Sequence, residues 1–148
     1  MIGPEAIGRC FGPSRVRVDA GRLRFFAKAT GEQRDLYRST EAARAAGYAD
    51  IPAPPTYGFC LAMLDEDEPM GWMRDLGIDL TRVLHAEQDF TYHGQICAGD
   101  DLTLTRRIVD VQDRKGGALT FVVADSEGRD DDGALKVAMR MTIAVRNS

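Results

Sequence analysis

Four titratable side chains in this chain have the types and spacing for proton chemistry. His85 and Glu87 stand two residues apart in a strand-like segment, which predicts that both lie on one face. Glu32 and Asp35 occupy a polar loop, Gly31–Arg38. A histidine beside a carboxylate can accept and return a proton near neutral pH. A second interpretation stays open: His85 in a hydrogen-bonded structural cluster, and both loop carboxylates simply solvated.

Composition argues against several other kinds of chemistry. Cys10, Cys60 and Cys97 lack the spacing of metal ligands, so we expect reduced thiols, no metal site and a cytoplasmic location. No phosphate-binding glycine loop is present, and we expect no cofactor. A net charge of −4 and an isoelectric point near 5.2 argue against nucleic acid or an anionic membrane as partner. The longest near-apolar run, Tyr57–Leu64, is too short to span a bilayer, and the N-terminus lacks a signal-peptide pattern.

Two short helices are predicted on either side of the polar loop. Asp19 can cap the first, whose apolar residues recur at helical spacing. Ser39 or Thr40 can cap the second, which ends at Gly47. The apolar positions of the first helix are Leu23, Phe26, Ala27 and Thr30.

A third helix is predicted to begin around Pro55–Thr56 and to run to Leu64. Its apolar residues surround it almost completely, which is typical of a buried helix. The acidic segment Asp65–Pro69 is expected to end this helix in solvent.

Beyond this helix the hydrophobic period changes to two, which indicates strands. In the first strand we expect Leu84 and Ala86 to share a face with Phe90 and Tyr92, and we expect a solvated loop at Ser126–Gly133. The predicted strands are Val83–His93, Leu102–Val111, Leu119–Asp125 and Leu135–Val145. At 148 residues the chain is expected to form one domain, residues 1–148. One apolar helix followed by antiparallel strands predicts an α+β fold of the hot-dog type, in which the sheet wraps round the helix. Such a sheet has free edges, so we expect a dimer.

The sequence resembles the MaoC-like hydratase/dehydratase family, specifically its FAS1-like dehydratase branch. The matching segments, in order, are Phe11–Ser14, Phe26–Glu32, Tyr37, Ala45–Tyr48, Ala53–Thr56, Leu84–Gln88 and Gly99–Asp100. The resemblance implies acyl-thioester substrates on coenzyme A or acyl carrier protein. It also implies reversible addition of water to a trans-2-enoyl thioester, giving the (R)-3-hydroxyacyl thioester.

Catalytic members of this family carry a Gly-Asp-x-Asn-Pro-x-His motif whose Asp and His handle the protons. Here Glu32 stands at the Asp position and Tyr37 at the His position, with Arg34 and Asp35 replacing Asn and Pro. A tyrosine, with a pKa near 10, is a poor base at neutral pH. The usual acid–base pair is therefore not carried over, and His85, Asp35 and Glu32 are the predicted surrogate catalytic residues.

A second departure lies at the entry to the buried helix. The family usually has His-Gly there, and the Gly N–H helps to bind the thioester oxygen; this chain has Pro54-Pro55, and proline has no N–H. The amides of Thr56 and Tyr57 are expected to serve instead. The predicted substrate-binding residues are Tyr37, Pro54, Thr56, Tyr57, Gly58 and Gln88.

These observations favour a hydratase/dehydratase subunit that forms a homodimer or pairs with a catalytic MaoC-like subunit. A homodimer that binds acyl thioesters without turning them over is the alternative. A thioesterase is disfavoured, because Thr56–Leu64 contains no carboxylate. Arg106, Arg107 and Arg140 could meet carrier phosphates, although strand arginines usually form a solvated face.

Overall fold

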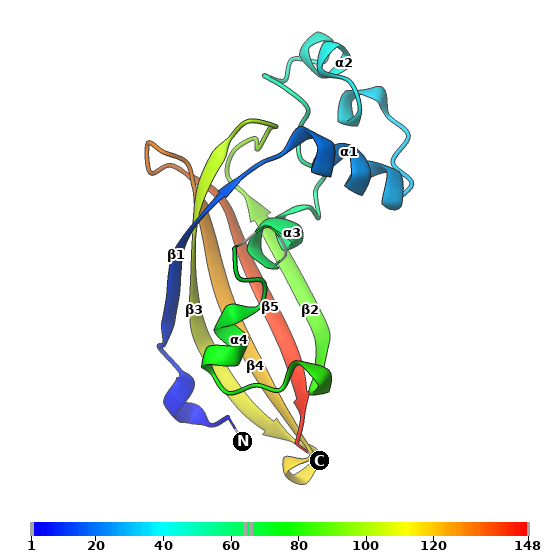
Figure 1. Cartoon of the computed structure of the whole chain (residues 1–148). Helices are drawn as coiled ribbons and strands as arrows, with labels where there is room; N and C mark the ends of the chain where they lie inside the picture. The colour runs from blue at the N-terminus through cyan, green and yellow to red at the C-terminus, as the bar shows by residue number, and fades with distance from the viewer. Residues whose placement is uncertain (1, 64, 66, 148) are drawn as a thin grey trace.

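Five antiparallel strands form one curved sheet in the computed structural model, which describes residues 2–63, 65 and 67–147 (Figure 1). The order across the sheet is β1-β3-β4-β5-β2, so β1 and β2 are its edges. The strands are β1 (Cys10–Arg17), β2 (Val83–Tyr92), β3 (Asp101–Arg114), β4 (Leu119–Arg129) and β5 (Leu135–Arg146). The sheet wraps round a central helix, which confirms the predicted α+β, hot-dog architecture.

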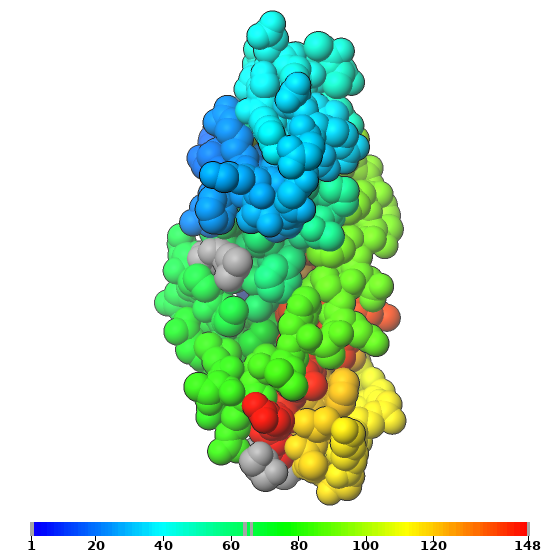
Figure 2. Space-filling model, turned by 90° about the vertical axis from the view of Figure 1, so that its right-hand side faces the viewer, coloured from blue at the N-terminus to red at the C-terminus, as the bar shows by residue number. Residues whose placement is uncertain are grey.

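The helices lie in two places (Figure 1). α1 (Ala20–Ala29), the single turn η2 (Asp35–Tyr37) and α2 (Thr40–Ala45) lie beyond one end of the sheet, and we call them the cap. α3 (Gly58–Met63) and α4 (Gly71–Asp75) lie along the sheet, while both chain termini lie at the end opposite the cap. Seen from the side, the cap projects from the body of the molecule (Figure 2). The other single turns are η1 (Pro4–Ala6), η3 (Leu80–Arg82) and η4 (Lys115–Gly117).

Both cap helices begin where the sequence predicts. The Asp19 side chain accepts a hydrogen bond from the Arg22 amide at 2.8 Å, and the Ser39 hydroxyl accepts one from the Ala42 amide at 3.3 Å. Each bond satisfies an amide that the first helical turn leaves without a partner, which is worth about 1 kcal/mol. Thr30 closes α1 by donating to the Phe26 carbonyl at 2.9 Å.

The central helix is shorter than predicted. α3 begins at Gly58 rather than at Pro55–Thr56, because the preceding residues form a tighter turn in which the Tyr57 amide donates to the Pro54 carbonyl. The predicted end at Leu64 lies outside the described residues. Leu61 of α3 is fully buried, and burial of such a side chain contributes about 1.5–3 kcal/mol.

Gly58 lets α3 approach the sheet closely. A Cβ at this position would lie 3.1 Å from Phe90 Cε1 and 3.2 Å from Met139 Sδ, which is tighter than an ordinary contact. The core beneath the helix contains two packed groups of buried residues. Ile51, Tyr57, Leu61 and Val137 belong to the group near the cap. Met63, Trp72, Ile108, Val122 and Ile143 belong to the group near the termini.

Two strand predictions need correction. β4 continues through Arg129, so the first half of the loop predicted at Ser126–Gly133 is strand, with Ser126 and Gly128 packed inward. β1 was not predicted at all, because Gly12-Pro13 interrupts its alternation and produces an irregularity in its pairing with β3. In the described part of the chain, no helix has the length and apolar character needed to cross a bilayer.

Candidate functional site

A cavity of about 490 Å³ opens between the cap and the end of β2, and we call it the mouth cavity. Tyr37 and Pro55 line it from the cap side, and Tyr92 closes it from β2 by donating its hydroxyl hydrogen to the Pro55 carbonyl. The full lining is Tyr37, Tyr48, Pro52, Ala53, Pro55, Tyr92, His93, Gly94, Gln95 and Ile96. Of the predicted substrate-binding residues, Tyr37 therefore lies where a ligand can reach it. Pro54 is buried beside this wall.

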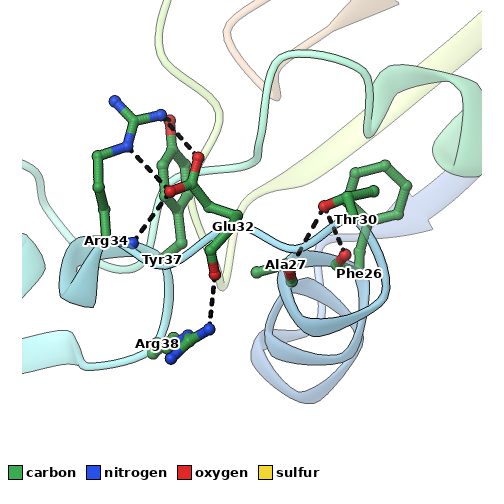
Figure 3. A network of polar contacts seen from close by, with 7 residues as sticks. All are labelled: Phe26, Ala27, Thr30, Glu32, Arg34, Tyr37 and Arg38. Carbon is green, nitrogen blue, oxygen red and sulfur yellow. Dashed lines mark hydrogen bonds and ion pairs between the residues drawn. The ribbon is translucent and has the colours of Figure 1, made fainter.

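Behind this cavity, Glu32 and Arg34 are locked together (Figure 3). Arg34 donates to the Glu32 carboxylate from Nε at 3.0 Å, from Nη2 at 2.8 Å and from its backbone amide at 3.0 Å. The guanidinium carbon lies 4.9 Å from the centre of the Tyr37 ring, and Nη2 donates to the Tyr37 hydroxyl at 3.4 Å. Arg38 lies on the other side of the loop and donates to the Glu32 carbonyl at 2.6 Å. Arg34 stands where the family motif has Asn. Its contacts thus hold the side chains of both Glu32 and Tyr37 in place.

This lock weakens Glu32 as a proton acceptor. The Arg34 hydrogen bonds lower the pKa of Glu32 from 4.5 to about 2. A carboxylate with this pKa is ionised at neutral pH and is a weak base there. Asp35 at the start of η2 is exposed, and among the described residues its carboxylate has no hydrogen-bond partner. Of the two carboxylates predicted to be catalytic in this loop, one is neutralised and the other is solvated.

The entrance to α3 offers different amides from those predicted. The Tyr57 amide is engaged with the Pro54 carbonyl at 2.9 Å, so it is not free for a thioester oxygen as we expected. Within the described residues, the amides of Thr56 and Gly58 make no hydrogen bond. Thr56 is exposed and Gly58 is buried. The predicted role of the Thr56 amide keeps its geometric basis, while that of the Tyr57 amide does not.

The Tyr57 side chain belongs to a buried clamp that sequence reasoning missed. Its hydroxyl donates to Asp65 Oδ2 at 2.7 Å, and Arg22 of α1 pairs with the other oxygen of the same carboxylate. The Asp65 side chain is 6% exposed, so the expectation that the acidic segment ends α3 in solvent is wrong at this residue. Burial raises the pKa of Tyr57 to about 12, which keeps the hydroxyl protonated as a donor. Phe26 of α1 packs edge-on against the Tyr57 ring, with ring centres 5.3 Å apart.

On β2, a bulge separates the predicted pair His85 and Glu87. His85 lies opposite Ile143 and Glu87 opposite Thr142, which leaves Ala86 as an extra residue in the strand. Directly opposed residues share a face, so His85 points inward with Ile143 and Glu87 points outward. The same shift places Leu84 outward, where it is 52% exposed, rather than with Phe90. The predicted proton-handling pair on one face is therefore wrong.

His85 instead contacts α3 and Gln88. Its ring stacks on Phe59 with centres 5.0 Å apart and planes at 30°. His85 Nε2 lies 3.3 Å from Gln88 Oε1, and Gln88 Nε2 donates to the Arg140 carbonyl at 3.2 Å. Gln88 lies opposite the inward-facing Met141. The structure thus brings together His85 and Gln88, one residue predicted as catalytic and one as substrate-binding, on the side of β2 that faces α3.

The predicted catalytic residues do not form one constellation within this chain. A strand rises about 3.3 Å per residue, so His85 lies roughly 20 Å from Tyr92 at the mouth cavity. Tyr37 and the Glu32–Arg34 pair lie at that distant end. A single small substrate atom cannot contact both groups.

The three strand arginines, for which a solvated face was weighed against contacts with coenzyme A phosphates, separate into different environments. Arg106 is 6% exposed, lies with its guanidinium carbon 5.0 Å from the Trp72 ring centre, and donates to the Ala62 carbonyl, so it is a core residue. Arg140 forms a bidentate pair with Asp125 on the outer face. Arg107 is exposed. The cysteines are free thiols. Within residues 2–63, 65 and 67–147, no group of three or more His, Cys, Asp or Glu side chains is placed to hold a metal ion.

Comparison with known proteins gives one family. The family model described as the FAS1-like dehydratase domain region matches residues 5–139. A UPF0336 protein of Clavibacter michiganensis subsp. michiganensis is 38% identical over 147 residues, which cover 98% of this chain and 96% of that protein.

Solved structures agree at the level of the fold. The C-terminally truncated HadBC (3R-hydroxyacyl-ACP dehydratase) complex of Mycobacterium tuberculosis contains a chain that superposes with a TM-score of 0.80 at 25% identity, covering 96% of this chain and 99% of that one. A MaoC-like dehydratase superposes with a TM-score of 0.81 at 19% identity, covering 97% of this chain and 43% of that one.

Proposed function

This chain belongs to the family of FAS1-like dehydratase domains, and from that premise we propose that it is the thioester-binding subunit of an (R)-specific hydratase/dehydratase. The observation that supports this most is the distance of roughly 20 Å along β2 from His85 to Tyr92 at the mouth cavity. Glu32, on the cap side, is already neutralised by Arg34. The chain thus has a cavity lined by Tyr37, the residue at the motif's His position, but lacks an assembled acid–base pair.

The reaction that we propose is addition of water across the double bond of a trans-2-enoyl thioester. The hydroxyl group of water bonds to C3 after a base removes its proton, and C2 takes a proton from the conjugate acid. Between the bonding of water to C3 and the protonation of C2, negative charge develops on the thioester oxygen, and preorganised amide donors stabilise this charge. This chain supplies the mouth cavity for the substrate and the unbonded amides of Thr56 and Gly58 near it.

The second subunit supplies the Asp and His of the Gly-Asp-x-Asn-Pro-x-His motif. We place it against β2, because among the described residues this edge strand pairs with β5 alone and, unlike the other edge strand β1, it contributes a residue, Tyr92, to the mouth cavity. An open edge is a template for pairing with another chain. The HadBC neighbour is itself a complex by its printed name, which supports assembly with a second chain here.

Hydration assays test the proposal. The purified chain is expected to be nearly inert towards crotonyl thioesters, and addition of a family member that carries the complete motif is expected to restore turnover. Full turnover by the chain alone would contradict the need for a second subunit. Tight binding of the thioester without turnover in any such combination would favour the alternative, a non-catalytic binding homodimer.

Thioesterase activity is disfavoured by the surroundings of Asp65. A hydrolytic carboxylate near α3 must reach water or the thioester carbon. Asp65 is the first carboxylate after this helix, and both of its oxygens are engaged, by Tyr57 and by Arg22. Release of free coenzyme A from an acyl thioester, followed with a thiol reagent, is therefore expected to stay at background.

A further inference from the structure

The outward side of α1 carries an aromatic side chain with almost no cover. Phe25 is 74% exposed, a large value for a phenylalanine in a folded domain. At 100° per residue, Phe25 lies at the middle of the exposed arc of α1. Lys28 and Arg24 lie on one side of it and Arg22 on the other, and all three are exposed. We call this surface the α1 face.

An apolar groove adjoins Phe25 and extends towards α3. Its volume is about 560 Å³. The residues that line it are Asp19, Gly21, Arg22, Phe25, Phe26, Ala29, Tyr57, Cys60 and Asp65. The buried clamp of Tyr57, Asp65 and Arg22 forms one end of the groove and so fixes its shape. The groove therefore offers space for an apolar side chain, and the Tyr57–Asp65 hydrogen bond holds the end of it that lies near α3.

Apart from Arg22, which pairs with the Asp65 carboxylate, the cations beside the groove form no ion pair among the described residues. Arg24 Nε donates to the Arg38 carbonyl at 2.9 Å, and Arg38 Nη2 donates to the Glu32 carbonyl at 2.6 Å. In the described ranges, neither of these arginines nor Lys28 forms an ion pair. Residues 20–47 contain six Lys and Arg against three Asp and Glu, a net charge of +3 in a chain whose total is −4. Positive charge is thus concentrated on the cap of an acidic protein.

We propose that the α1 face docks an acidic carrier protein that presents the acyl thioester. This inference rests on the proposed function and names the partner that delivers its substrate. An exposed aromatic next to an apolar groove is the arrangement of an interface hot spot, with cations as its polar rim. The unpaired cations then complement acidic residues on the carrier, which speeds encounter and fixes orientation.

The distribution of these groups favours a protein over coenzyme A. The phosphates of coenzyme A form one compact anion, which a tight cluster of donors would bind. Here the cations spread along α1 and onto the following loop, with Phe25 between Lys28 and Arg22. Arg38 directly follows Tyr37 of the mouth cavity, so a carrier on this face would hold its prosthetic arm near that opening.

Binding of the two carriers to matched variants tests the proposal. Crotonyl-loaded acyl carrier protein of the host and crotonyl-CoA are titrated separately against the full chain, with its partner subunit where one is required. The double variant Arg24→Glu/Lys28→Glu and the single variant Phe25→Ser are expected to weaken binding of the carrier protein by about tenfold or more. Binding of crotonyl-CoA is expected to stay unchanged. Arg114→Glu, which reverses an exposed charge at the end of β3 opposite the cap, is the control and should alter neither titration.

Each other outcome counts against the docking surface. Equal weakening for both carriers would assign the cations to the phosphopantetheine arm that the two carriers share, and weakening for crotonyl-CoA alone would assign them to coenzyme A phosphates. No weakening in either titration, or binding of crotonyl-CoA alone, would remove the α1 face as a carrier site. Failure of the wild type to bind either thioester would contradict the proposed function itself. Phe25 is exposed, so loss of folding does not confound the single variant.

Discussion

The cap and strand β2 hold their polar side chains in opposite ways. In the cap, Glu32 receives three hydrogen bonds from Arg34, and Tyr37 packs under the same guanidinium with 7% of its surface exposed. On β2, the exposed His85 has one contact at 3.3 Å with Gln88 and a ring stacked on Phe59. The family motif places its acid–base pair in the first region, yet in this chain the histidine lies in the second.

This difference suggests what the cap is for. Glu32, Arg34 and Arg38 satisfy one another and the backbone, so they fix a surface instead of exchanging protons with a ligand. The His85 side chain has no such partner set, but it lies roughly 20 Å from the mouth cavity. The two regions therefore support the proposal of a subunit that shapes a site whose reactive groups come from a second chain.

The strongest test compares proton-transfer residues across the assembled pair. Replacing the motif His of the catalytic subunit by Ala is expected to lower kcat by about 10²–10⁴, the range for loss of general acid–base catalysis. His85→Ala and Asp35→Asn in this chain are each expected to lower kcat by less than about tenfold, because neither joins an assembled pair. Initial rates of crotonyl-thioester hydration give these values. A loss for His85→Ala as large as that for the motif His would make β2 a catalytic element.

A test of intermediate size targets the clamp that joins the cap to the central helix. Tyr57→Phe removes the donor to the buried Asp65 carboxylate and should cost about 1–3 kcal/mol in the free energy of unfolding by urea. Hydrogen exchange should quicken at the amides of α1 more than at those of β2.

Tyr48→Phe is the matched control for the clamp. Tyr48 lines the mouth cavity, and among the described residues its hydroxyl makes no hydrogen bond. Its stability change should stay within about 0.5 kcal/mol. Equal effects of the two substitutions would mean that the Tyr57–Asp65 bond does not couple α1 to α3.

The smallest effect is a pH dependence confined to the cap. Because Arg34 lowers the pKa of Glu32 from 4.5 to about 2, their pairing stabilises the fold above about pH 4.5 and ceases to do so as the pH falls towards 2. Glu32→Gln should therefore melt below the wild type at neutral pH, and the difference should vanish as the pH falls through this window. Thermal unfolding across that range measures it. Glu87→Gln on β2, an exposed carboxylate without a described partner, should show no such window.

Local signals predicted much of the fold. Asp19 and Ser39 start their helices because a side-chain oxygen needs only a nearby amide, which the sequence places two or three residues away. The alternation in β5 survives because Val137 and Ile143 reach the core on one face. The apolar run of α3 predicted a buried helix for the same reason.

The predictions that failed concern side chains whose environment is set by contacts that the local sequence does not indicate. Asp65 is buried because Arg22, 43 residues earlier, returns to pair with it. Nothing in the acidic run around Asp65 signals that partner. Glu32 looked like a free carboxylate because the spacing Glu-Gln-Arg does not specify a two-residue ion pair. The α1 face was not predicted from the sequence. The helical spacing of apolar residues in α1 leaves Phe25 on the outer side, and this spacing alone does not indicate a function for an exposed phenylalanine.

The bulge at Ala86 also bears on how this family changes in length. Two residues, His85 and Ala86, stand opposite Ile143 alone, so removal of Ala86 would leave every other residue of β2 facing as it does now. A one-residue deletion beyond the bulge would turn all residues on one side of the cut inside out. We therefore expect related sequences to gain or lose a residue of β2 at the position of Ala86. In a scan of single-residue deletions along β2, deletion of Ala86 should be the one that still gives a folded protein.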